Sequence, residues 1–152
     1  FVLGGRCNSQ VIFASFLSGY FESHRDQYYA GLQSISRNGD WERWIGYFLN
    51  AVVEQSRENI RKARDIHALY DAKKERIRSI THSQYSVQAL DFLFSFPVFN
   101  SVDFVKNSGI PRATALRMLK LLTTKGVIEE VRKGTRGKPS IFIFPKLLAI
   151  VK

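Results

Sequence analysis

Apolar residues recur at helical spacing through most of this chain, and the pattern predicts a mainly α-helical protein. From about residues 19 to 34, apolar positions three and four apart lie on one side of a helix that Ser18 can cap. Gly39 is expected to end this helix, and Asp40 is a strong N-cap for the next one. A second apolar stripe continues over residues 41–77 and predicts a long helix.

The helix predicted over residues 41–77 is about 55 Å long at 1.5 Å per residue, too long for one small core to cover. We therefore expect either a kink or packing against several elements, including another subunit. Its second half, residues 57–78, carries alternating charges. Such a pattern is typical of a solvated helix face with ion pairs four residues apart, and contact with nucleic acid is the alternative.

Shorter predicted elements follow the long helix, and this change in element length predicts a domain boundary at residues 80–83. Ser83 is expected to cap a helix that Pro97 ends. The apolar residues of this helix are expected to pack on a later helix: Val87, Leu90, Leu93 and Phe94. The predicted domains are a helical segment over residues 1–82 and a second domain over residues 83–152.

Residues 101–124 have the pattern of two helices joined by a tight turn. Ser101 is the expected N-cap of the first helix. Gly109 can take the positive φ that the turn needs, and Pro111 suits the first turn of the second helix because it has no amide to lose. The second helix is predicted to end near Thr124. The pattern is that of a helix-turn-helix.

The second of these helices has one apolar and one basic face. Ala115, Leu119 and Leu122 recur at spacings of four and three, and are expected to face the core. The opposite face carries small, basic and hydroxyl side chains: Ala113, Arg117, Lys120 and Thr124. A recognition helix needs such a face, because it must enter a groove lined with phosphates.

A β-hairpin is predicted after this helix. Gly126 ends the helix, residues 127–131 alternate as a strand, and residues 140–144 supply its partner. The connecting loop is expected to be flexible and carries four cations: Arg132, Lys133, Arg136 and Lys138. The order of elements predicts a winged helix-turn-helix domain with a small β-hairpin wing. The residues expected to bind DNA are Arg112, Thr114, Arg117, Lys120, Lys133, Arg136 and Lys138.

Winged-helix domains also serve as protein interaction modules, and two leucines favour that alternative. Leu116 and Leu121 lie beside the basic face rather than on the core face. A domain that only reads DNA usually carries polar residues at such positions. The two leucines instead suit contact with another part of the protein.

The net charge of +10 is concentrated in the second domain. Residues 1–80 hold 12 Lys/Arg and 9 Asp/Glu, whereas residues 81–152 hold 11 and 4. This excess attracts polyanions, and it supports nucleic acid as a partner without excluding a ribosome or a membrane surface. The single cysteine, Cys7, excludes an internal disulfide and a cysteine metal cluster, and suits the cytoplasm. No apolar run is long enough to span a bilayer.

Over about residues 17–70 the helical segment carries the following set of residues: Leu17, Ser18, Tyr20, Phe21, Arg25, Tyr28, Tyr29, Leu32, Gly39, Asp40, Trp41, Trp44, Phe48 and Leu49. With this set, the segment resembles the region after the active-site motif in Fic family proteins. A C-terminal winged helix, as predicted for residues 83–152, is also similar to many members. The resemblance implies that the chain is the C-terminal part of a Fic family protein, a family of protein adenylyltransferases.

Fic enzymes typically move AMP from ATP onto a protein hydroxyl, and their motif is His-Pro-Phe-x-x-Gly-Asn-Gly-Arg. In that motif the histidine deprotonates the hydroxyl, the acidic position holds magnesium and the glycine-rich turn binds phosphates. None of His24, His67 and His82 precedes a proline, and Gly4-Gly5-Arg6 is not a complete phosphate loop. We therefore expect no catalytic residue, no metal site and no cofactor in this chain. The resemblance implies ATP and magnesium only for the complete enzyme, with the motif upstream of residue 17.

Two hypotheses about function follow. The first is a DNA-binding or regulatory module that acts in transcription regulation. The second is an interaction scaffold that forms a homodimer or docks on the missing catalytic part. Salt-dependent binding to duplex DNA distinguishes the two. No membrane partner is expected.

Overall fold

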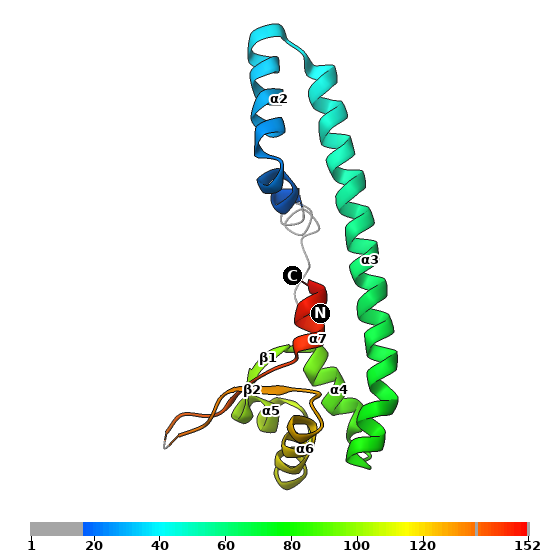
Figure 1. The fold of residues 1–152 in the computed structure, drawn as a ribbon, viewed down its shortest axis with the longest axis vertical. Helices are drawn as coiled ribbons and strands as arrows, with labels where there is room; N and C mark the ends of the chain where they lie inside the picture. The colour runs from blue at the N-terminus through cyan, green and yellow to red at the C-terminus, as the bar shows by residue number, and fades with distance from the viewer. Residues whose placement is uncertain (1–16, 136, 152) are drawn as a thin grey trace. The chain divides into compact units, whose positions relative to one another are not determined.

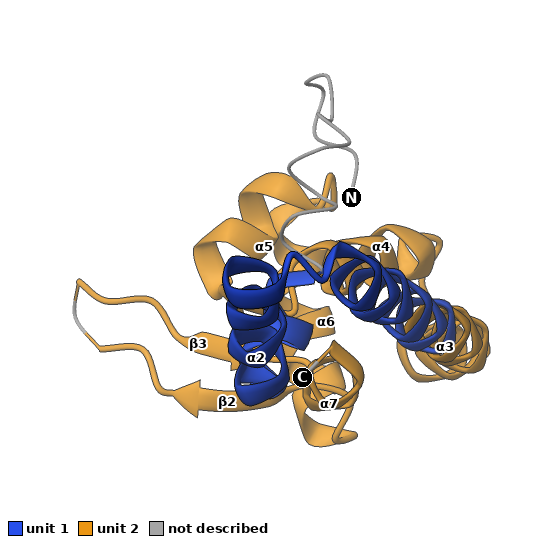
Figure 2. Cartoon of the chain, turned by 90° about the horizontal axis from the view of Figure 1, so that it is seen from above, with its two compact units in different colours: residues 1–61 blue, residues 62–152 orange. Residues whose placement is uncertain are grey.

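The computed structural model describes residues 17–135 and 137–151 of the chain. These residues are mainly helical, as predicted, and also form one three-stranded antiparallel sheet (Figure 1). They belong to two compact units, and the division falls between Arg61 and Lys62 (Figure 2). No helix within the described ranges combines the length and apolar character that crossing a bilayer requires.

Unit 1, which ends at Arg61, contains a helix over residues 17–23, α2 (Arg25–Asn38) and the first half of α3 (Trp41–Thr81). Unit 2 contains the rest of α3 and all later elements. These are α4 (Ser86–Ser95), β1 (Val98–Asn100), α5 (Ser101–Asn107), α6 (Arg112–Thr124), β2 (Glu129–Arg132), β3 (Ile141–Ile143) and α7 (Pro145–Val151).

The long helix predicted over residues 41–77 is confirmed. α3 is a single helix of 41 residues and continues to Thr81. Its second half belongs to the core of unit 2, because Ile77 is fully buried there and Leu69 packs against the same cluster. The compact units therefore divide within α3, whereas the boundary predicted after residue 82 follows the end of this helix.

In unit 1 the helix predicted over residues 19–34 is already formed at Leu17, so Ser18 lies within it and is not the N-cap that was predicted, and an irregular turn follows at His24. The backbone of His24 has φ −121° and ψ 37°, outside the helical region, and α2 begins at the next residue. The His24 ring stacks on Tyr20 with ring centroids 4.2 Å apart, and its Nδ1 lies 3.0 Å from the Tyr20 carbonyl oxygen. The His24 amide still donates to the Tyr20 carbonyl oxygen at 3.1 Å, and the Tyr28 amide donates to the His24 carbonyl oxygen at 3.0 Å, so backbone hydrogen bonds bridge this irregular turn. These contacts give His24 a structural role.

The turn between α2 and α3 follows the sequence prediction. α2 ends at Asn38, and Gly39 takes a left-handed φ of 64°. The Oδ1 atom of Asp40 accepts a hydrogen bond from the Arg43 amide at 3.2 Å, so Asp40 caps α3 as predicted.

Close packing of aromatic rings joins α2 to α3. The rings of Tyr28 and Trp44 meet edge to face with centroids 5.4 Å apart. Gly31 of α2 is buried next to the same indole, and a Cβ atom added to Gly31 would lie 2.7 Å from Trp44 Cε3. The close approach of the two helices therefore requires a glycine at this position.

The sheet of unit 2 has the strand order β1-β3-β2, with β3 in the centre. The predicted hairpin is present, but β2 starts at Glu129 because Val127 and Ile128 are buried in the core before the strand begins. The sequence did not predict β1, in which Phe99 pairs with Phe142 of β3. The predicted two-stranded wing is thus part of a three-stranded sheet.

Two of the predicted helix caps in unit 2 are wrong. Asn100 caps α5, since its Oδ1 accepts hydrogen bonds at 2.9 Å from the second and third amides of the helix, and Ser101 is the first helical residue. α4 begins after Tyr85. The Ser83 hydroxyl oxygen accepts a hydrogen bond from the Tyr85 amide at 3.2 Å, so Ser83 forms a turn before the helix.

The core of unit 2 confirms the predicted inner face of α6. The buried residues on this face are Ala115, Met118, Leu119 and Leu122, of which Met118 was not predicted. On α4, Leu90 and Leu93 are buried and Phe94 packs against the core, but Val87 is 43% exposed and is not the core residue that was predicted. Gly109 and Gly126 have φ values of 69° and 64°, which confirms both predicted turns.

A hydrogen bond ties α3 to α4 at the edge of this core. The Tyr70 hydroxyl donates to Asp91 Oδ1 at 2.6 Å. The Tyr70 ring also packs edge to face on Phe94, with ring centroids 5.1 Å apart. The hydrogen bond to Asp91, together with burial, raises the pKa of Tyr70 to about 12, because both favour the protonated hydroxyl.

We predict opposite effects for two glycine substitutions in unit 1. Gly31→Ala forces a methyl group into the Trp44 ring and should lower the free energy of unfolding by about 1 to 3 kcal/mol. Gly46→Ala is the matched control, because a Cβ at Gly46 meets no atom within 4 Å. It should instead raise the free energy of unfolding by up to about 1 kcal/mol through helix propensity. Urea unfolding followed by circular dichroism measures both, and equal stabilisation by the two variants would contradict the packing argument.

Removing the Tyr70 hydroxyl should destabilise unit 2. Tyr70→Phe is expected to lower the free energy of unfolding by about 1 to 2 kcal/mol at neutral pH. The unfolded tyrosine ionises near pH 10.0 but the folded one only near 12, so the contribution of the hydroxyl is complete below pH 10.0 and declines as pH rises towards 12. Denaturant titrations across this range test the trend. In an Asp91→Ala background the same substitution should have a smaller effect, and an unchanged cost would show that the hydrogen bond contributes nothing.

Candidate nucleic-acid interface

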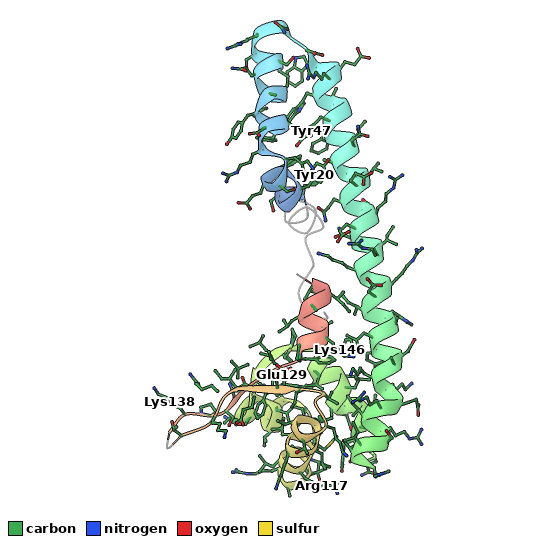
Figure 3. All side chains as sticks on the ribbon, in the orientation of Figure 1. Tyr20, Tyr47, Arg117, Glu129, Lys138 and Lys146 are labelled. Carbon is green, nitrogen blue, oxygen red and sulfur yellow. The ribbon has the colours of Figure 1, made fainter. Side chains whose placement is uncertain are left out.

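The outer face of α6 carries the cations that the sequence pattern placed there. Arg112, Arg117 and Lys120 are exposed, and Thr114 is half-buried. The buried face of the helix fixes this arrangement, because residues three and four apart share a side of a helix. Arg117 projects from α6 in Figure 3. The predicted basic face of α6 is therefore present and accessible.

The N-terminal end of α6 adds a positive partial charge that the residue types alone do not reveal. Pro111 occupies the N-cap position rather than the first turn, and no side chain caps the helix. The first turn also contains no acidic residue. Its backbone amides, next to Arg112, therefore present unneutralised positive ends of peptide dipoles. This is the arrangement that binds phosphate groups at helix ends.

The hairpin continues outward beyond β2 and β3. Thr135 and Lys138 exchange two backbone hydrogen bonds of 2.9 Å each, and Gly137 has a φ of 91°. The Gly134 amide donates to the Ser140 hydroxyl oxygen at 2.8 Å. The segment predicted as a flexible loop thus contains a further β-bridge. In both Figure 1 and Figure 2 the hairpin extends away from the body of unit 2.

Charge is distributed unevenly along this hairpin. Glu129 and Glu130 lie on the part of β2 next to the core, whereas Lys133 and Lys138 lie on the outer part, and all four are exposed (Figure 3). Arg136 lies outside the described residues. Arg132 is the last residue of β2, so the positive charge of the hairpin begins at the outer end of this strand, beyond the acidic residues at its start.

The cations of α6 and those of the hairpin form two separate groups. Figure 3 shows Arg117 and Lys138 on different projections of unit 2. In the part of the chain that the structure describes, no ion pair or side-chain hydrogen bond engages Arg112, Arg117, Lys120, Lys133 or Lys138. Their charges remain available to an anionic partner that is wide enough to touch both projections.

Apolar residues border the basic face, as predicted. Leu116 is 47% exposed and Leu121 is half-buried. An exposed leucine next to the cations provides a surface that a protein partner can also use.

Two of the histidines contact polar groups close to them in the chain. Nδ1 of His24 lies 3.0 Å from the Tyr20 carbonyl oxygen. Nδ1 of His67 lies 3.2 Å from Asp71 Oδ2 on the exposed side of α3. Within residues 17–135 and 137–151, no three side chains of the types His, Cys, Asp and Glu come together as metal ligands. Gly4-Gly5-Arg6 and Cys7 lie outside the described residues.

No family model matches the chain. The Fic resemblance therefore stays a prediction based on the residues quoted above. What the site can do follows from its geometry: two groups of cations without an ion pair to any described residue and one uncapped helix end, all on unit 2.

Proposed function

We propose that unit 2 contains a winged helix-turn-helix domain that binds duplex DNA. In this proposal α5 and α6 are the helix-turn-helix, and the β2–β3 hairpin is the wing. The observation that carries the proposal is the exposed face of α6, where Arg112, Arg117 and Lys120 have no ionic partner among the described residues and lie beside an uncapped helix end. A duplex supplies the negative charge that this face lacks.

The residues of the site divide into two roles. Arg117 and Lys120 lie along the exposed face of α6, where a recognition helix contacts base edges in the major groove. Arg112, Thr114 and the first amides of α6 hold a backbone phosphate, because that helix end attracts anions. The wing contributes further phosphate contacts from three cations: Lys133, Arg136 and Lys138.

We also propose that the chain is the regulatory C-terminal part of a Fic family protein. Support comes from unit 1, where Tyr28, Trp44 and the Gly39-Asp40 turn, all positions of the resemblance, join α2 to α3. In this role the chain itself transfers no nucleotide. ATP and magnesium belong to the catalytic part, on which unit 1 docks, and DNA binding by unit 2 places the complete protein on a regulatory sequence.

The proposal predicts different consequences for wing and helix cations. Lys133→Ala or Lys138→Ala should weaken binding to all duplexes about equally and reduce the slope of log K against log salt by about 1. Arg117→Ala should instead cost about 1 to 3 kcal/mol on a preferred site and relax preference at one base position. Fluorescence anisotropy with labelled duplexes at several salt concentrations measures both effects.

Arg57→Ala is the charge-matched control for these variants. Arg57 lies on unit 1 and is paired with Glu54 at 2.8 Å, so its loss should leave the salt slope unchanged. Absence of binding at low salt would contradict the proposal. Binding that survives the simultaneous loss of the six cations Arg112, Arg117, Lys120, Lys133, Arg136 and Lys138 would also contradict it.

One feature of unit 1 favours a second function, an interaction scaffold that forms a homodimer. Exposed apolar side chains follow one another at spacings of four along the first half of α3: Trp41, Ile45, Leu49 and Val53. Residues at this spacing are neighbours on the helix surface, so the row forms one continuous apolar patch. Such a patch has a larger area than a single exposed apolar residue. In this alternative a second copy of the chain covers the row.

The scaffold function predicts a dimer that depends on this row. Leu49, which is 57% exposed, should support association, so Leu49→Lys should shift a dimer towards monomer in sedimentation velocity at micromolar concentration. Asn50→Lys adds the same charge at the neighbouring exposed position and should leave association unchanged. A wild-type protein that sediments only as a monomer at these and higher concentrations would remove this alternative.

A further inference from the structure

β2 lies at one edge of the three-stranded sheet of unit 2. The strand order β1-β3-β2 leaves one side of β2 without a neighbouring strand, and all four residues of the strand are exposed. Alternate residues of an edge strand direct their amide and carbonyl groups away from the sheet, where a strand of another chain can pair with them. β2 therefore presents a backbone edge together with exposed side chains.

The charges along this edge change sign at Val131. Glu129 and Glu130 precede it, and Arg132 and Lys133 follow it. None of these four charged side chains forms an ion pair with a described residue. Charged residues on an edge strand usually prevent pairing with another chain, because like charges directly opposite each other repel. The order of the signs in β2 removes this repulsion for one arrangement.

That arrangement is antiparallel pairing of β2 with β2 of a second copy of the chain. If the two strands run in opposite directions about a two-fold axis at Val131, Glu130 of each copy lies opposite Arg132 of the other. Glu129 of each copy then lies opposite Lys133. Parallel pairing in register would instead place every charge opposite an identical charge, which is destabilising. The charge pattern of β2 is therefore complementary to itself in the antiparallel arrangement.

Val131, at the centre of this arrangement, is the residue of β2 that β3 leaves unpaired. The register with β3 shifts between Glu130 and Arg132, so Val131 is the extra residue of a bulge. A bulge disturbs pairing with a strand that lacks it, whereas two copies of β2 carry the extra residue at the same position and stay in register with each other. The Val131 side chain is 63% exposed, and the two valines would cover each other at the axis.

We propose that the free edge of β2 pairs with β2 of a second copy of the chain and joins the two sheets into one. This surface is separate from the apolar row on α3 and from the outer face of α6. The inference goes beyond the proposed DNA binding and does not require it. Lys133 belongs to both surfaces, so its pairing with Glu129 of the second copy competes with its contact to a phosphate.

Sedimentation velocity of charge-reversal variants at low ionic strength tests the pairing. All samples carry Leu49→Lys, which removes association through the α3 row. In this background the protein with an unchanged β2 should form a dimer. Glu130→Arg places arginines opposite each other, and Arg132→Glu places glutamates opposite each other. Each variant should raise the dissociation constant of the dimer by at least about tenfold, because two pairs of opposite charge become two pairs of like charge.

An equimolar mixture of the two variants should recover the association that each has lost. In one chain arginines flank Val131, and in the other chain glutamates flank it, so the two strands are again complementary. The mixture should form a heterodimer with about the affinity of the unchanged β2. Recovery would also show that both variants are folded.

Lys106→Glu is the matched control. Lys106 is exposed on α5, and its reversal changes the net charge as much as Arg132→Glu does. This variant should dimerise like the protein with an unchanged β2, and mixing it with Glu130→Arg should restore no association. Recovery in that control mixture would show that association follows net charge alone and would overturn the proposal. Two further results would also overturn it: a monomer at micromolar and higher concentration with an unchanged β2, or one dissociation constant for all variants.

Discussion

The burial of one face of α6 in the core of unit 2 decides which residues are left for a partner. Ala115, Met118, Leu119 and Leu122 are buried together, and the 3.6-residue period of the helix then places Arg117 and Lys120 in solvent. Pro111 and Arg112, at the uncapped start of the helix, are also exposed. A rotation of α6 would bury a cation and expose a leucine, so the apolar face and the basic face stabilise one orientation. The candidate interface is therefore a consequence of the core.

Lys73 lies on the buried face of α3 although its side chain is charged. Its position on the inner face of α3 is set by Tyr70 and Ile77, and the packing of these neighbours keeps the lysine covered. An apolar residue at this position would satisfy the pattern without a desolvation cost.

The sequence predicted the features that depend on local spacing and missed those that depend on distant partners. The long α3, the inner face of α6 and the turns at Gly109 and Gly126 follow from periodicity and from glycine at positive φ. β1 depends on pairing with β3, which lies more than forty residues later in the chain. β1 has only three residues, and a segment this short shows no recognisable strand pattern in the sequence. The irregular backbone at His24 lies within an otherwise helical pattern, and nothing in that pattern marks it.

The candidate site likewise contains features that the sequence predicted and features that it did not. The α6 cations followed from the pattern, because a helix with a known inner face has a known outer face. The capping state of α6 and the outer β-bridge of the hairpin did not follow. The first depends on Pro111 standing one position before the helix, and the second on hydrogen bonds between Thr135 and Lys138 and from Gly134 to Ser140. Lys73 belongs with these, since an alternating charge pattern on α3 gives no sign that one of its lysines is buried.

In unit 1 the apolar residues of the helical pattern are mostly not buried. Among its described residues only Leu17, Gly31 and Ala51 are buried, and two of these have a small side chain or none. Burial of such residues contributes little, because hydrophobic stabilisation is about 25 cal/mol for each Å² of apolar surface removed from water. Large apolar side chains such as Trp41 and Leu49 remain in solvent on the same unit. The second half of α3 thus carries its apolar residues for the core of unit 2, whereas much of the apolar surface of the first half remains exposed in this chain.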